Sequence, residues 1–325
     1  MAATSIKTAC QSINKPINSF RLGEKFMKAG MIGLGNMGSE IAKRLLSFGV
    51  TVGVFDINEK AVNELVGFGA VEVNTPMELA RNYPYIITIL PNSAIVKEIV
   101  LGENGLIHGF AQNSLLIEMT TSIPAVTKEL SQALVERSFR MIDAPVSGGV
   151  KKAENGTLSI MVGGEEHDFL EVKSLLDKIG EHVTHVGAIG AGHTIKALNN
   201  MISSTTLAIT GEAIALGVKL GLDPSKMLEV INSSTGRSFS SVLKFPTQIV
   251  NRKFDSGFTL DLMVKDLKIA MSMAEDENVP MDIGTANLQL WKQALAEEEG
   301  QDHTAIVKHI EEKFQVEIKE LQKNS

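Results

Sequence analysis

The sequence predicts a doubly wound α/β domain on a parallel sheet, followed by an all-α domain. Three observations lead to this. The 325 residues exceed what one core usually organises. From Met27 short apolar runs alternate with amphipathic spans. After glycines at Gly187, Gly190 and Gly192, helical periodicity replaces this alternation. We therefore expect an N-terminal extension over 1–26, the α/β domain over 27–190 and the helical domain over 191–325.

The α/β part opens with a strand at Met27–Ile32 and a helix at Ser39–Phe48. A second strand, Val50–Phe55, ends on Asp56 and precedes a helix at Glu59–Phe68. Short apolar runs predict the remaining strands, at Tyr85–Leu90, Leu115–Glu118, Arg140–Asp143, Leu158–Val162 and His182–His185. In the second domain Ile195–Leu220 is long and poor in charge, but its Asn, Ser and Thr residues favour a buried central helix over a membrane span.

Composition narrows the classes of partner. Net charge is −7 and no basic stripe is interleaved with aromatic residues, so we expect no nucleic acid. The single cysteine, Cys10, excludes an internal disulfide and fits a reducing compartment. The close pair His182 and His185 has no acidic or thiol ligand beside it in the sequence, so we expect no metal site.

The first 23 residues have the composition of an organelle transit peptide. They contain Lys7, Lys15 and Arg21, no Asp or Glu, and several Ser, Thr, Asn and Gln residues. A plain N-terminal extension is the alternative. The expected location is therefore the mitochondrial matrix, with the cytoplasm as the alternative.

One glycine-rich motif follows the first predicted strand and opens the first predicted helix, namely Gly33-Leu34-Gly35-Asn36-Met37-Gly38. Three glycines at this spacing permit a tight turn, a close approach of the backbone to a diphosphate, and close packing of helix on strand. The exposed amides and the positive end of the helix dipole favour that diphosphate. The motif predicts a dinucleotide site and makes the α/β domain one of the Rossmann type.

Asp56 stands 18 residues after Gly38, at the end of the second predicted strand. A carboxylate at this corner accepts hydrogen bonds from the ribose hydroxyls and repels a 2′-phosphate. The expected cofactor is therefore NAD rather than NADP.

Two further segments have residues suited to chemistry. A lysine whose pKa is lowered can exchange the proton of a hydroxyl group, and Lys196 lies in the first turns of an apolar helix with Asn200 four residues later on the same face. A lysine at a helix start is more often solvated, so this role stays open on the residues alone. The amides of Gly148 and Gly149, after Ser147, could hold a carboxylate or form only a turn.

Together these segments resemble the β-hydroxyacid dehydrogenase family over Met27 to the C-terminal region. The resemblance rests on four ordered motifs, Gly33 to Gly38, Asp143 to Gly149, Gly190 to Asn200, and Lys265-Asp266-Leu267. It implies a homodimer or homotetramer built through the helical domain, with a small hydroxy acid as substrate.

The resemblance also implies roles for individual residues. Lys196 would be the catalytic lysine, Ser147, Gly148 and Gly149 would hold the substrate carboxylate, and Asn200 would orient the substrate. Cofactor contacts are implied for Leu90, Pro91, Thr121 and Lys265. Glu118 and Met119 stand where the family usually has an aspartate and a serine before that threonine.

The substrate is indicated by the run Ser234 to Ser241, which looks like the 3-hydroxyisobutyrate branch of the family although Phe239 replaces a tryptophan. The Phe239 ring could pack against a substrate methyl group, or the run could be a simple turn between helices. The expected reaction is NAD-dependent oxidation of 3-hydroxyisobutyrate to methylmalonate semialdehyde, a step of valine catabolism. Alternatives are reduction of tartronate semialdehyde, succinic semialdehyde or glyoxylate, and a non-catalytic scaffold.

Overall fold

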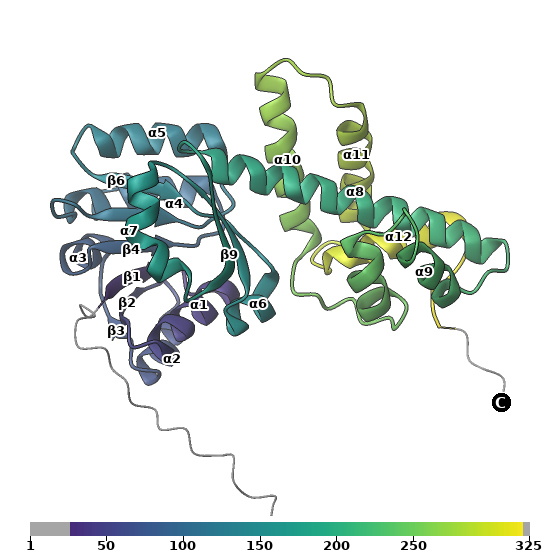
Figure 1. The fold of residues 1–325 in the computed structure, drawn as a ribbon, viewed down its shortest axis with the longest axis horizontal. Coiled ribbons are helices and arrows are strands. Elements are labelled where there is room, and N and C mark those ends of the chain that lie inside the picture. The colour runs from purple at the N-terminus through teal and green to yellow at the C-terminus, as the bar shows by residue number, and fades with distance from the viewer. Residues whose placement is uncertain (1–26, 321–325) are drawn as a thin grey trace, which may run out of the picture.

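A nine-stranded sheet forms the centre of the N-terminal domain in the computed structural model, which describes residues 27–320 (Figure 1). The predicted extension over 1–26 lies outside these residues, as does Cys10. The strands are β1 Lys28–Ile32, β2 Thr51–Phe55, β3 Val71–Glu72, β4 Tyr85–Thr88, β5 Leu115–Glu118, β6 Arg140–Asp143, β7 Val146–Ser147, β8 Leu158–Gly163 and β9 Gly180–Gly187.

The strand order is β3-β2-β1-β4-β5-β6-β8-β7, with β9 paired to β8. All pairs from β3 to β6 are parallel. The order reverses between β1 and β4, and such a switch point opens a crevice at the carboxyl ends of the strands. The fold thus places the glycine-rich turn and the loop after β4 at one ligand-binding edge.

Helices cover both faces of this sheet, and the strands are buried on both sides. In β4, Ile86 and Ile87 belong to different core clusters because successive side chains point to opposite faces. One face packs on α1 Asn36–Ser47, α2 Glu59–Gly67, α6 Gly149–Asn155 and α7 Glu166–Leu176. The other packs on α3 Pro76–Asn82, α4 Ser93–Leu101, η1 Leu106–His108 and α5 Pro124–Val135. The doubly wound prediction is confirmed.

The sheet departs from the prediction at one edge. β8 runs antiparallel to β6 and β7, so the expectation of a purely parallel sheet was wrong there. Only ten residues connect Ser147 to Leu158, fewer than a parallel crossover requires. The chain therefore returns alongside β7 before α7 carries it over to β9, which is again parallel to β8.

The C-terminal domain is helical, as predicted. It consists of α8 Ala191–Lys219, α9 Pro224–Asn232, the π-helix η2 Ser240–Ile249, α10 Leu260–Asp276, α11 Asp282–Glu297, η3 His303–Ala305 and α12 Ile306–Phe314. Its core surrounds the fully buried Trp291 and Phe245. The run after Ser234 was a candidate substrate loop, and its last two residues already belong to η2.

The 29-residue helix α8 runs from the sheet domain into the helical domain (Figure 1). Within residues 27–320 it is the one helix whose length and composition would allow it to cross a membrane. Half of its most apolar stretch is buried inside the protein, which is the arrangement of a core helix. Its N-terminal turns pack against β8 and β9, while later turns pack against α10 and α12.

Candidate active site

The turn between β1 and α1 requires glycine at its first and last motif positions. Gly33 has a φ of +93°, and a Cβ added there would lie 2.2 Å from the carbonyl oxygen of Ile89. A Cβ added at Gly38 would lie 1.9 Å from the carbonyl oxygen of Gly33. Both distances are far below van der Waals contact, so the tight turn and the packing of α1 on the sheet exclude any side chain.

The middle glycine faces open space. A Cβ at Gly35 would meet nothing within 4 Å, although Gly35 is the N-cap of α1. The first turn of α1 contains no acidic residue and no side chain caps its amides. Uncapped amides, the helix dipole and this open space fit the diphosphate of a dinucleotide.

Asp56 lies beside the same turn. Its Oδ2 accepts a hydrogen bond of 2.6 Å from the amide of Leu34, and its Oδ1 accepts one of 2.8 Å from the amide of Asn58. The carboxylate is therefore fixed at the carboxyl end of β2, next to the glycines. This placement fits the ribose contact that the sequence predicted.

Lys196 lies in the second turn of α8 and is only 7% exposed. Burial lowers the pKa of its amine, the carboxylate of Asp266 opposes this, and the positive charge of Lys265 adds to it. A lysine with a lowered pKa can hold a neutral amine near neutral pH and accept a proton. The solvated alternative for Lys196 is therefore wrong.

Asp266 on α10 is a residue to which the sequence assigned no role. It is buried, and its Oδ2 accepts a hydrogen bond of 2.6 Å from Nδ2 of Asn200. Burial raises the pKa of this carboxyl group, and Lys265 and Lys196 oppose that shift. The motif around Lys265 was recognised, but only the crossing of α8 and α10 shows that Asp266 orients Asn200 beside Lys196.

Lys265 connects the two domains. Its Nζ donates to the carbonyl oxygens of Pro91 and Thr121, at 3.2 and 3.3 Å. The amide of Leu90 donates to Oγ1 of Thr120 at 2.9 Å, which joins the loops after β4 and β5. The structure thus brings together the four residues for which cofactor contacts were implied.

The Ser147 loop lies at the end of β7 and the start of α6. Gly148 and Gly149 have φ angles of +138° and +72°, and both are exposed, while Ser147 is half-buried. Positive φ at two successive residues leaves their amides free to turn toward a ligand. Phe239 lies elsewhere, 61% exposed at the start of η2, and its contact with a substrate methyl group stays a prediction.

A buried charged cluster anchors the start of α8 to the sheet. Asp143, at the end of β6, accepts hydrogen bonds from the amides of Gly190 and His193 at 2.6 and 2.8 Å. The fully buried His193 places Nε2 3.0 Å from Oε2 of Glu118 and Nδ1 2.8 Å from Oγ1 of Thr127. Burial alone would lower the pKa of His193, but Glu118 and Asp143 outweigh it and the pKa is raised.

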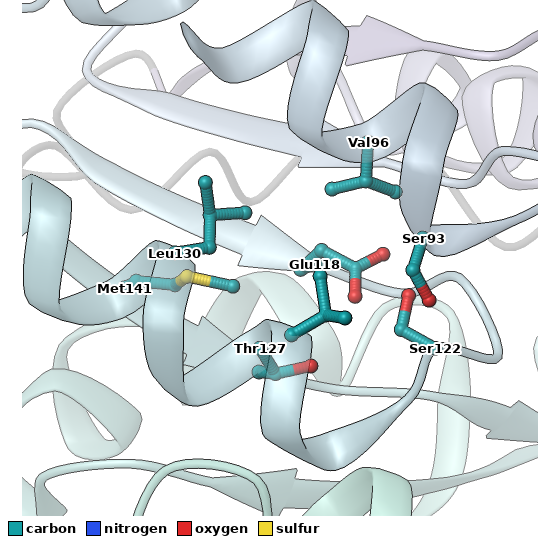
Figure 2. Close-up of a pocket in the computed structure, with 8 residues that line it drawn as sticks. Ser93, Val96, Glu118, Ser122, Thr127, Leu130 and Met141 are labelled. Carbon is teal, nitrogen blue, oxygen red and sulfur yellow. The ribbon is translucent and has the colours of Figure 1, made fainter. Parts of the chain in front are cut away.

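Glu118, which departs from the family pattern, has two further contacts. Its Oε1 accepts a hydrogen bond of 2.7 Å from the amide of Thr120, so it also supports the loop that Lys265 contacts. Figure 2 shows its carboxyl group in a small pocket between Ser93, Ser122 and Thr127. That pocket is too tight to admit a water molecule, so it is not a ligand site. Glu118 therefore has a supporting role, because it contacts His193 and the loop after β5.

The fold and the site together define a two-domain dehydrogenase. A dinucleotide-binding turn with an acidic ribose contact lies in one domain. A buried lysine and an oriented carboxamide lie on the helix that leads into the other. These are the parts needed to bind a dinucleotide and to move a hydroxyl proton.

Comparisons with known proteins agree. The family model of the NAD binding domain of 6-phosphogluconate dehydrogenase matches residues 28–187. The model described as NAD-binding of NADP-dependent 3-hydroxyisobutyrate dehydrogenase matches residues 190–310. The two models together span nearly all of the described chain.

Among relatives, 2-(hydroxymethyl)glutarate dehydrogenase of Eubacterium barkeri is 37% identical, over 88% of this chain and 95% of its own. The mitochondrial 3-hydroxyisobutyrate dehydrogenase of Homo sapiens is also 37% identical, over 82% and 81%. The solved 3-hydroxyisobutyrate dehydrogenase of Mycobacterium tuberculosis with L-serine superposes with a TM-score of 0.82 at 27% identity, covering 88% of this chain and 99% of that one. The chain belongs to the β-hydroxyacid dehydrogenase family, whose cofactor here is NAD.

Asp56→Asn removes the negative charge at the ribose corner and keeps a hydrogen-bond acceptor. We expect the ratio of kcat/KM with NAD to kcat/KM with NADP to fall about 10-fold, because the repulsion of a 2′-phosphate is relieved. Glu59→Gln is the matched control, since it removes an exposed acid at the start of α2. An unchanged ratio in Asp56→Asn would contradict the assigned role.

His193→Gln should change how the free energy of unfolding depends on pH. The folded-state pKa of His193 is raised above its unfolded value of 6.5, so the stabilisation is complete below that value and is lost as pH rises through the folded pKa. Each unit of the shift corresponds to about 1.4 kcal/mol. Urea unfolding followed by circular dichroism from pH 5.5 to about 9.5 measures this. The exposed His182→Gln is the control, and a pH-independent difference between wild type and His193→Gln would refute the charged cluster.

Proposed function

We propose that this protein oxidises 3-hydroxyisobutyrate to methylmalonate semialdehyde with NAD as the hydride acceptor. The observation that supports an acid–base role most strongly is the buried Lys196 of lowered pKa beside Asn200. The substrate is supported by the relatives named 3-hydroxyisobutyrate dehydrogenase and by the likeness of the Ser234–Ser241 run to that branch.

In the proposed mechanism the substrate carboxylate binds the hydroxyl group of Ser147 and the amides of Gly148 and Gly149. The side chain of Asn200, held by Asp266, orients the substrate hydroxyl toward Lys196. The neutral amine of Lys196 accepts the hydroxyl proton as the carbon–hydrogen bond breaks. Bound NAD supplies the acceptor for the hydride. The products are the aldehyde, NADH and a protonated Lys196, which returns its proton to solvent.

The second candidate function is a reaction with a related small hydroxy acid or aldehyde acid. The name of one relative, 2-(hydroxymethyl)glutarate dehydrogenase, supports a related hydroxy acid. Reduction of tartronate semialdehyde, succinic semialdehyde or glyoxylate would use the same groups with a protonated Lys196. A non-catalytic scaffold is disfavoured because such a protein would have no need of a buried lysine at this position.

We also propose a mitochondrial matrix location and assembly into a homodimer or homotetramer. The composition of the first 23 residues supports the location. Exposed Ile202, Ile209 and Leu216 along α8 supply an apolar face that supports assembly. A mature N-terminus shortened by about 20 to 26 residues would support import, and light scattering would measure the mass in solution. An unprocessed N-terminus would contradict the mitochondrial location, and a monomeric mass would contradict the assembly.

Lys196→Ala tests the central role. We expect kcat to fall about 10² to 10⁴-fold with 3-hydroxyisobutyrate, because one acid–base group is lost. NAD binding, followed by calorimetry, should persist because the glycine turn and Asp56 are untouched. Near-normal turnover in the variant would exclude Lys196 as the acid–base group.

Serine, 4-hydroxybutyrate and glycerate, assayed beside 3-hydroxyisobutyrate, identify the preferred substrate. No turnover of any of them with either cofactor would favour the scaffold.

A further inference from the structure

A second lysine, Lys244 on η2, meets the same face of α8 as Lys196. Its Nζ lies 3.4 Å from Oγ of Ser203 and 2.8 Å from Nε2 of His303. Ser203 follows Lys196 by seven residues, which is almost two full turns of an α-helix. Lys196, Asn200 and Ser203 therefore stand in one row, and Lys244 approaches the far end of that row.

The ammonium group of Lys244 has only neutral hydrogen-bond partners. None of the ion pairs within residues 27–320 includes Lys244. His303 places Nδ1 3.0 Å from both Oγ of Ser256 and the carbonyl oxygen of Phe258, which leaves Nε2 to accept from Lys244. The charge of Asp302 acts on Lys244, but its carboxylate accepts hydrogen bonds from Ser256, Gly257 and Thr304.

The charges around Lys244 favour the binding of an anion to its ammonium group. Burial lowers the pKa of Lys244 to about 8, Asp302 opposes this, and the positive charge of Lys196 adds to it. The two lysines therefore lie close enough to repel each other. A half-buried cation that has no carboxylate partner is stabilised by an incoming anion.

We propose that Lys244 binds a second carboxylate of the substrate, so that the site accepts hydroxy dicarboxylic acids. The inference rests on the proposed function, because the reacting half of the substrate is held as described for 3-hydroxyisobutyrate. That half comprises a hydroxymethyl group and the carboxylate bound at Ser147, Gly148 and Gly149. The second carboxylate extends from the remaining branch along the row from Lys196 to Ser203.

Three acids form a matched series. In 3-hydroxyisobutyrate the branch is a methyl group. In 2-(hydroxymethyl)glutarate it is a two-carbon arm ending in a carboxylate, and in 2-(hydroxymethyl)pentanoate it is an arm of the same length ending in a methyl group. The ratio of kcat/KM for the glutarate to kcat/KM for the pentanoate isolates the contribution of the second charge from that of the arm.

The test is Lys244→Met, which keeps an unbranched side chain and removes the cation. We expect the glutarate-to-pentanoate ratio to fall about 10 to 100-fold, the range for losing a hydrogen bond to a charged group. Lys244→Arg should retain most of the ratio. Lys268→Met removes an exposed cation of α10 and should leave the ratio unchanged.

The pH dependence separates binding of the second carboxylate from a merely structural role. In the wild type the ratio should fall as pH rises through about 8, because Lys244 loses its charge, whereas Lys244→Arg should show no such fall. Of the groups facing Lys244, Asp302 stays ionised and His303 stays neutral in this range, because its burial lowers its pKa. Titration of Lys196 acts on both acids, and Lys244→Arg, whose cation does not titrate in this range, shows any part of it that remains in the ratio.

Calorimetric binding of 2-(hydroxymethyl)glutarate and 2-(hydroxymethyl)pentanoate to the NAD-bound protein separates the role of Lys244 from the proposed oxidation. Glutarate binding that depends on Lys244 supports the second-carboxylate site even if no acid is oxidised, an outcome that would reject the proposed function alone. Equal glutarate-to-pentanoate ratios for the wild type and Lys244→Met, in binding or in turnover, would overturn the role of Lys244 and leave oxidation of 3-hydroxyisobutyrate standing.

Discussion

The attachment of α8 to the sheet through Asp143 is the contact on which the rest of the site depends. One carboxylate at the end of β6 accepts two amides from the start of this helix, where the dipole also favours negative charge. Lys196 and Asn200 follow within three turns. This attachment therefore sets the distance between Lys196 on α8 and the dinucleotide turn after β1. The pair of His193 and Glu118 stabilises the attachment.

Burial then gives the charged groups on α8 their chemical properties. Lys196 and Asp266 are both withdrawn from water, so burial shifts both pKa values toward the neutral forms, and each charge partly supports the other. Asp266 also orders Asn200, and its neighbour Lys265 reaches across to the loops after β4 and β5. Cofactor contacts and acid–base chemistry are thus connected through adjacent residues of α10.

Features fixed by local constraints could be predicted from the sequence. The glycine turn was recognisable because steric exclusion of a Cβ acts within a few residues, and the central strands were recognisable because burial on both faces leaves continuous apolar runs. The antiparallel edge at β8 was missed because an apolar run does not reveal strand direction. The sequence feature that indicates the antiparallel direction of β8 is the short connection after Ser147.

The sequence by itself determined the two domains, the NAD site and the identity of the candidate lysine, since each follows from residue type and short spacing. Tertiary structure alone decided which distant groups meet each other around that lysine and at the start of its helix. Asn200 and Asp266 are 66 residues apart, as are Thr127 and His193, and Lys244 and His303 are 59 apart. Contacts over such separations depend on how helices cross and how strands pair, and a lysine's pKa depends on the burial that this packing creates.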